Sequence, residues 1–474
     1  MGNSLHTASI HILDDYSLLH VFYLYRPFIL GEDEDETDRL YGGTGDWIHG
    51  RWWYKPAHVC QRWRNIILGS ASYLGLSLVC TYGTPVADML AHSPPLPLII
   101  DYTEDISAED VEGAVLALKQ RDRVLRVRFD MSFTNLQKLI MAVDEAYPIL
   151  EYLVVAPPIE DGSTILRFPE TLQAPHLRHL TLISFALPIG SRLLTTAVGL
   201  VTLCLVMNDP STYFHPRTLL RWISFMPQLE TLVVSFLFPV PNGDVERQLA
   251  HTIVTPVTLP NLHQFTFRGV SAYLEALIHR ITTPRLEKLR IYFFNQLTFS
   301  VPRLLHLVTT TESLRLEDAK LWFYDERIYV EFYPRGEAEM FFISLNVDCW
   351  HLDWQLSSLS QILNSLSEPF SAVEHLTLEH EEHTQSFEEH NEVDRIEWRK
   401  LLRSFRKVKT LWIDDGLVEQ LSRCLQLDDG ELPLELLPEL QELTYSGSGK
   451  SGDAFSAFID SRQNAGRPVT LVHP

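Results

Sequence analysis

Cysteine is scarce in this chain, and long apolar runs are absent. The 474 residues include five cysteines, which lie far apart and contain no CxxC pair. This usage predicts reduced intracellular thiols and excludes a disulfide framework. No apolar stretch approaches the ~18 residues that a membrane helix requires, and the start has no charged and apolar segments typical of a secretory signal. We therefore expect a soluble protein that is cytoplasmic or nuclear.

Basic residues are few relative to acidic ones. The chain has 39 Lys and Arg against 61 Asp and Glu, which gives a formal net charge of -22. Such a surface repels phosphate backbones and anionic lipid headgroups, so the sequence predicts neither nucleic acid nor a membrane as partner. One acidic run, Glu32–Glu36 followed by Asp38, predicts a solvated loop insert over residues 31–45.

The motifs of catalysis are also missing. No GxSxG elbow, GxGxxG turn or cysteine-nucleophile signature occurs. The phrase SGSGKSG at 446–452 has Thr444 where the first glycine of a phosphate-binding loop belongs. His380 and His383 are three residues apart among glutamates, which is not the HExxH spacing of a zinc site. We expect no catalytic residue, no metal site and no cofactor, and hence a protein that is not an enzyme.

One phrase recurs along the chain, L-x-x-L-x-L in variants. Examples are LEYLVV from Leu150, LETLVV from Leu229 and LEKLRI from Leu286, and poorer copies end at Leu316 and Val347. The central apolar positions of the copies are Leu153, Leu180, Leu203, Leu232, Phe265, Leu289, Leu314, Leu345, Leu376, Leu411 and Leu443. Successive positions are 23 to 35 residues apart. Since leucine-rich repeats run ~20–29 residues, several units here are long.

The phrase has a physical meaning. Alternating apolar positions place one side of a short strand in a core, and segments with helical spacing lie between the copies. A strand-turn-helix unit of this size buries its apolar side only by stacking on its neighbours. We therefore predict an α/β fold over residues 71–474, an irregular leucine-rich-repeat solenoid with a curved parallel sheet and outer helices. The alternative is an ordinary α/β domain with leucine-rich strands.

Two amphipathic segments precede the repeats. Residues 10–25 carry an apolar stripe behind Asp14 and Asp15, which can cap a helix start. The stripe consists of Leu13, Leu18, Leu19 and Phe22. In the second segment the apolar positions repeat at helical spacing, with polar residues between them. These positions are Val59, Trp63, Ile66 and Ile67. The sequence thus predicts two helices in a small all-α module.

Together the two segments resemble an F-box. The resemblance covers about residues 9–70 and depends on Leu13-Asp14-Asp15, Leu18-Leu19 and the V-C-x-x-W-R phrase from Val59 to Arg64. It implies a three-helix module that docks on the Skp-type adaptor of a cullin ubiquitin ligase. The residues that the resemblance implies for adaptor contact are Leu13, Leu18, Leu19, Phe22, Val59, Cys60, Trp63 and Ile66. The alternative is that these side chains only cap the first repeat.

Strand residues between the buried leucines are free to carry binding specificity. Since Trp, Tyr and Arg dominate protein-binding hot spots, we expect the substrate contacts among residues of these types. They are Arg268, Arg290, Tyr292, Arg315 and Trp412. With Lys288 the arginines form a basic patch, which predicts an acidic or phosphorylated substrate segment. Our hypothesis is a substrate-recognition subunit of an SCF-type ubiquitin ligase; the alternative is a leucine-rich-repeat protein-binding scaffold without a ligase role.

Overall fold

A computed structural model describes most of the chain. The described residues are 13–26, 50–103, 107–143, 145–157, 165–238, 256–296, 298–310, 316–334, 342–349, 352–366, 372–380, 392–426, 434–446 and 454–472. They fall into two compact units, Met1–Leu205 and Val206–Pro474. The acidic run at 31–45 lies outside the described residues. No described helix is both long enough and apolar enough to cross a membrane.

Unit 1 begins with short helices and continues with strands separated by helices. The helices are α1 (Asp15–Tyr25), α3 (Tyr54–Ala57), α4 (Gln61–Gly69), α5 (Ala71–Leu74), α6 (Val86–His92), α7 (Ala108–Leu118), α8 (Phe133–Ala142) and α9 (Arg192–Thr196), with a 3-10 turn at Arg121–Arg123. The main sheet is ordered β1 (Leu78–Cys80), β2 (Leu98–Tyr102), β3 (Val124–Asp130), β4 (Tyr152–Ala156), β6 (His179–Ile183) and β8 (Thr202–Met207). The pairs from β1 to β6 are parallel, and α7 packs on β1 and β2. A small parallel pair joins β5 (Leu166–Arg167) to β7 (Phe185–Ala186).

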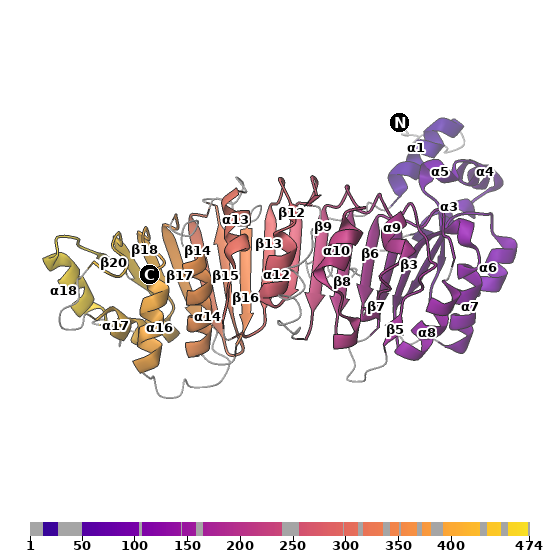
Figure 1. The fold of residues 1–474 in the computed structure, drawn as a ribbon. Helices are drawn as coiled ribbons and strands as arrows, with labels where there is room; N and C mark the ends of the chain where they lie inside the picture. Colours follow the sequence, from indigo (N-terminus) through magenta and orange to yellow (C-terminus); the bar gives the residue numbers. More distant parts are fainter. Residues whose placement is uncertain are drawn as a thin grey trace, which may run out of the picture. The chain divides into compact units, whose positions relative to one another are not determined.

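Unit 2 repeats this pattern over more strands. Its helices are α10 (Pro216–Ile223), α12 (Ser271–Ile278), α13 (Pro302–Thr310), α14 (Leu352–Ser365), α16 (Glu392–Leu402), α17 (Asp415–Leu425) and α18 (Ser456–Asn464), with a 3-10 turn at Pro210–Thr212. The sheet is ordered β9 (Thr231–Phe236), β11 (Gln264–Gly269), β13 (Lys288–Phe293), β16 (Phe342–Asp348), β15 (Arg327–Tyr333), β14 (Asp318–Tyr324), β17 (His375–His380), β18 (Thr410–Ile413), β19 (Glu442–Tyr445) and β20 (Thr470–Val472). A separate pair joins β10 (Val257–Thr258) to β12 (Ile281–Thr282). Figure 1 shows α12, α14 and α16 against one face of these strands.

The strand registers explain why the repeated phrase folds as it does. The central residue of one copy pairs with that of the next, as in Leu232 with Phe265 and Phe265 with Leu289. All three side chains are buried. Removing each such side chain from water stabilises the fold by about 1.5–3 kcal/mol, and the benefit requires a neighbouring unit. The prediction of a mixed α/β fold with stacked parallel strands is confirmed.

The prediction of one parallel strand per copy is wrong between β13 and β17. The chain passes from β13 to β14, reverses through the antiparallel strand β15, and returns as β16 beside β13. Strand β14 begins at Asp318, after the phrase that ends at Leu316. The hairpin was missed because its turn, Asp325-Glu326, has neither the glycine nor the asparagine that marks a two-residue turn. This three-strand insertion creates the cavity described below.

Alternation along the unit 2 strands separates two faces. On β14, Leu321 and Phe323 are buried, whereas Lys320 and Trp322 are half-buried. The helices pack against the first set, because successive strand residues point to opposite sides. The second set forms what we call the polar face. Its members include Arg268, Arg290, Tyr292, Lys320, Trp322, Tyr329 and Trp412.

Candidate protein-binding sites

Helix α1 is initiated by a side-chain cap. The carboxylate of Asp14 accepts a hydrogen bond of 2.7 Å from the backbone N–H of Ser17. This bond satisfies one of the amide groups that a helix start leaves without a partner. It also lowers the pKa of Asp14, since the donor stabilises the charged carboxylate. The predicted capping role is therefore confirmed for Asp14.

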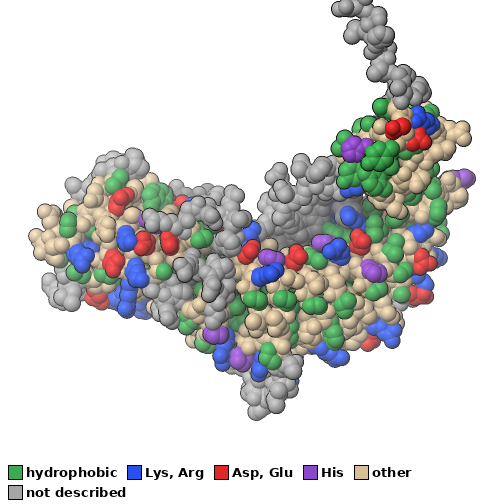
Figure 2. All heavy atoms as spheres, turned by 90° about the horizontal axis from the view of Figure 1, so that it is seen from above, with side chains coloured by type: hydrophobic (Ala, Val, Ile, Leu, Met, Phe, Trp, Pro, Cys, Tyr) green, Lys and Arg blue, Asp and Glu red, His purple; other side chains and the backbone are tan. Residues whose placement is uncertain are grey.

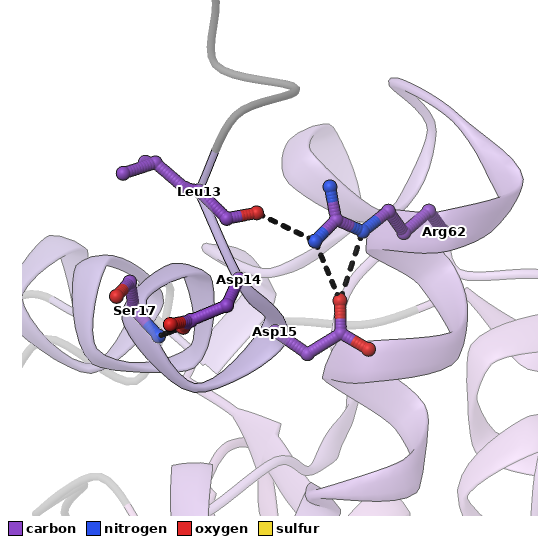
Figure 3. A network of polar contacts seen from close by, with 5 residues as sticks. All are labelled: Leu13, Asp14, Asp15, Ser17 and Arg62. Atoms are coloured by element: carbon purple, nitrogen blue, oxygen red, sulfur yellow. Dashed lines mark hydrogen bonds and ion pairs between the residues drawn. The ribbon is translucent and has the colours of Figure 1, made fainter.

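Arg62, within the V-C-x-x-W-R phrase, ties helix α4 to the start of α1 (Figure 3). Its Nε donates to Asp15 Oδ1 at 2.9 Å, and an Nη donates to the carbonyl of Leu13 at 2.6 Å. A planar guanidinium suits this arrangement because its donors point in fixed directions. The same pair of helices is held by Phe22 and Trp63, whose rings meet edge to face at 5.0 Å. The two predicted helices thus form one paired module.

Two of the predicted adaptor contacts are core residues of this module. Leu18 is 0% exposed and Phe22 is 2% exposed. We correct their assignment, because a side chain buried between its own helices is not available to a partner. From the sequence alone the two roles are indistinguishable, since both require an apolar residue at helical spacing. Leu18 and Phe22 hold the module together.

The other predicted adaptor contacts are accessible. Leu13 is 38% exposed, and Val59 is 61% exposed. Val59 precedes α4, which begins at Gln61, so its prediction as part of the helical stripe is wrong. The half-buried members are Leu19, Cys60, Trp63 and Ile66. Whether these accessible residues contact an adaptor stays a prediction.

A groove of about 660 Å³ runs along α1 and α4. Two predicted contacts, Leu19 and Ile66, line it together with Tyr16, which the stripe did not include. Tyr16 is 81% exposed, and Leu24 farther along α1 is 69% exposed. Figure 2 shows hydrophobic side chains gathered at the end of the view where Figure 1 places α1. Exposed apolar groups rimmed by charge are typical of a protein-binding surface.

The arginines of the polar face do not form the free basic patch that the sequence predicted. Arg268 forms an ion pair of 2.9 Å with Asp348. Arg290 is only 7% exposed, and burial lowers the pKa of its guanidinium while the nearby Glu331 carboxylate opposes that shift. We correct the patch accordingly, because Arg268 is paired with Asp348 and Arg290 is buried. Arg315 lies outside the described residues.

The remaining predicted substrate contacts are half-buried. Trp412 lies on β18 between Thr377 and Thr444 of the adjacent strands. Tyr292 lies on β13, in register with Asn346 of β16. These two aromatic side chains stay candidate contacts.

A cavity of about 700 Å³ opens where the β14–β15 turn meets β13 and β16. Its lining residues are Tyr292, Tyr324, Asp325, Glu326, Arg327, Tyr329 and Asn346. Of these, only Tyr292 was among the predicted contacts; Tyr324 to Tyr329 belong to the unpredicted hairpin, whereas Asn346 lies on the strand predicted around Leu345. Asn346 is 4% exposed, and its Oδ1 has no hydrogen-bond partner among the described residues. The hydroxyl of Tyr329 donates a hydrogen bond to Glu331 Oε1, and burial raises the pKa of both side chains.

The candidate metal and phosphate motifs find no structural support in the described part of the chain. His380 ends β17, whereas His383 lies outside the described residues. No group of three or more His, Cys, Asp or Glu side chains suited to a metal occurs among the residues described. Most of the glycine-rich phrase at 446–452 is likewise outside them. Neither motif contributes to the sites above.

Comparisons with known proteins give little beyond this geometry. No family model and no curated protein matches the sequence. Among solved structures, the chain is similar to the leucine-rich repeat-containing protein LegL7 from Legionella pneumophila, at 10% identity. The match covers 83% of this chain and 99% of that one, with a TM-score of 0.24. A likeness this distant does not bear on function.

Proposed function

We propose that this protein is a non-enzymatic substrate-recognition subunit of an SCF-type ubiquitin ligase. The groove along α1 and α4 docks on a Skp-type adaptor of the cullin complex. The polar face of unit 2, within a leucine-rich-repeat solenoid, binds a protein substrate. The observation that carries the proposal is the accessible apolar surface of a helix pair that is already held together internally.

The module supports docking because its arginine is engaged in holding the two helices together, whereas apolar side chains remain at its surface. Arg62 is bound to Asp15 and to the Leu13 carbonyl, so this guanidinium stabilises the helix pair. Leu19, Ile66 and the F-box-like phrase around them remain at the surface. Burying apolar area against a partner is favourable by about 25 cal/mol per Å². A helix pair with this surface gains stability when a partner covers it.

A second candidate function is a protein-binding scaffold without a ligase role, whose first helices only cap the sheet. One observation favours it. Trp53 Nε1, at the start of α3, donates to the Ser77 carbonyl at 3.1 Å, and Arg51 donates to the Val79 carbonyl at 3.1 Å. These bonds tie the segment before α4 to the first strand. Capping accounts for these contacts but requires no exposed groove on α1.

Co-purification with a Skp-type adaptor distinguishes the two functions. We expect the full chain to retain the adaptor, and the double variant Leu19→Asp with Ile66→Asp to lose it. The matched control is Met141→Asp with Val198→Asp, which alters two exposed apolar residues elsewhere in unit 1. This control should keep the adaptor. Failure of the unmodified chain to bind would overturn the ligase role and leave the scaffold.

A further inference from the structure

We propose that the cavity at the β14–β15 turn is a subsite for one cationic side chain, arginine or lysine, of a bound polypeptide. The inference rests on the proposed function, because it takes the polar face as the substrate-binding surface. The sequence predicted an acidic or phosphorylated substrate segment, whereas this subsite would bind a positively charged one. The observations that support it are a polar floor, aromatic walls and an acidic rim.

The floor of the cavity offers a hydrogen-bond acceptor. Asn346 lies on β16 between Leu345 and Val347, whose side chains enter the core, so its amide is on the opposite, polar face. The side chain is more than nine-tenths buried, and its Oδ1 lacks a partner among the described residues. A buried acceptor without a donor is unfavourable, so the site is completed by a ligand that donates a hydrogen bond. Arginine and lysine side chains are donors only.

The walls of the cavity are aromatic. Tyr292, Tyr324 and Tyr329 come from three strands, and their rings line the same space. Cations bind over aromatic rings because the ring face carries partial negative charge. The polar face already uses this contact nearby, since Lys320 lies 4.5 Å from the ring centre of Trp322. A cationic side chain of a partner would contact aromatic rings in the same way.

The rim of the cavity is negative on balance. Asp325 and Glu326 form the turn, whereas Arg327 is the one cation among the lining residues. The neighbouring Arg268 is already matched by Asp348 at 2.9 Å. On the same face Arg290 is 7% exposed, and the Glu331 carboxylate counteracts the lowering of its pKa by burial. The cavity therefore repels an acidic or phosphorylated group and attracts a cation.

The experiment measures binding of short peptides to the purified full chain without adaptor. The probes are acetyl-Gly-Xaa-Gly-amide with arginine, lysine, citrulline or phosphoserine at the central position. We expect the arginine or lysine peptide to bind at least tenfold more tightly than citrulline, which has nearly the shape of arginine without its charge. The phosphoserine peptide should not bind. Equal affinities for arginine and citrulline, or a preference for phosphoserine, would overturn the proposal.

Two variants test the assigned residues. Asn346→Leu removes the acceptor and should weaken the cationic peptide about tenfold, which corresponds to about 1.4 kcal/mol. Asp325→Asn with Glu326→Gln neutralises an exposed turn that is not part of the core, and should weaken binding several-fold with less dependence on salt. Glu439→Gln with Glu442→Gln is the charge-matched control on exposed residues and should bind as the unmodified chain does. Unchanged binding in the turn variant would contradict the inference even if Asn346→Leu does not fold.

Failure of this inference is separable from failure of the proposed function. A chain that retains the Skp-type adaptor but binds no cationic peptide contradicts the subsite alone. A chain that binds the cationic peptide but no adaptor contradicts the ligase role and supports the subsite.

Discussion

The α1–α4 module and the polar face of unit 2 use the same residue types in opposite ways. In the module an arginine, Arg62, fixes the two helices to each other, and apolar side chains such as Leu19 remain accessible. On the unit 2 strands the aliphatic side chains face the core, whereas the polar face carries charged and aromatic side chains, and Arg268 there is paired with Asp348. The module thus presents an apolar surface and the sheet a polar one. Exposure and pairing, rather than residue type, indicate which groups are available to a partner.

Reversing the buried charge of Arg290 should give the largest loss of stability. This variant tests whether the charged side chains of the polar face are part of the fold or are available to a partner. Arg290→Glu places a second carboxylate beside Glu331 at a position that is 7% exposed. We expect the free energy of unfolding of unit 2 to fall by about 3–5 kcal/mol, the cost of a buried charge without a compensating partner. Urea denaturation followed by tryptophan fluorescence measures this loss. A variant as stable as the unmodified chain would show that Arg290 is accessible, as the basic-patch hypothesis required.

A pair of truncations in α1 tests the division between core and surface in the module. Phe22→Ala removes a buried ring that packs on Trp63 and should destabilise the helix pair by about 3 kcal/mol. Leu19→Ala, on the groove, should cost less than about 1 kcal/mol of stability and instead weaken adaptor binding. Hydrogen exchange of the α1 and α4 amides measures both effects. Equal loss of protection in the two variants would contradict the assignment.

Helices α1 and α12 should respond oppositely to acid, and this effect should be smaller than those of the substitutions above. The pKa of Asp14 is lowered by its capping bond, so its contribution is present above the unfolded value of 3.8 and is lost as pH falls through the folded pKa. The pKa of Glu275 in α12 is raised by burial, so the contribution of this group to stability increases as pH falls through that raised pKa towards the unfolded value of 4.5. Hydrogen exchange between pH 6 and pH 3 should show α1 losing protection while α12 does not.

One substitution in each helix tests the predicted direction of its pH dependence. Asp14→Ala should remove the acid dependence at α1. Glu275→Gln keeps one of the two oxygens that accept hydrogen bonds from the backbone amides of Arg303 and Leu304, and it should remove the dependence at α12. The same slope before and after either substitution would assign the pH effect to other groups.

The repeated phrase was enough to predict the strand cores. Each central leucine or phenylalanine, such as Leu232 and Phe265, is buried and in register with the next, because alternation fixes which side of a strand enters the core. The antiparallel insertion was not predictable in this way. Leu321 and Val330 alternate as well as any repeat strand, but their pairing depends on a turn without a glycine or asparagine signal.

The candidate sites were predictable only in part, for the same reason. Helical spacing identified Leu18 and Leu19 together, whereas their different burial depends on where α4 packs. Periodicity placed Tyr292 on the accessible side of its strand, but the cavity around it also requires Tyr329 from the unpredicted strand β15. The charge of a residue is read from sequence, but its pairing comes from tertiary neighbours. Arg290, which the charge alone assigned to an accessible patch, is buried by its neighbours.

Hydrogen exchange on the full chain with and without a Skp-type adaptor tests the central claim most directly. We predict a one-to-one complex in which new protection is confined to α1 and α4, including the segment around Ile66. The residues of the β14–β15 turn should be unchanged. Absence of a complex, or protection at the polar face with α1 unaffected, would contradict the account.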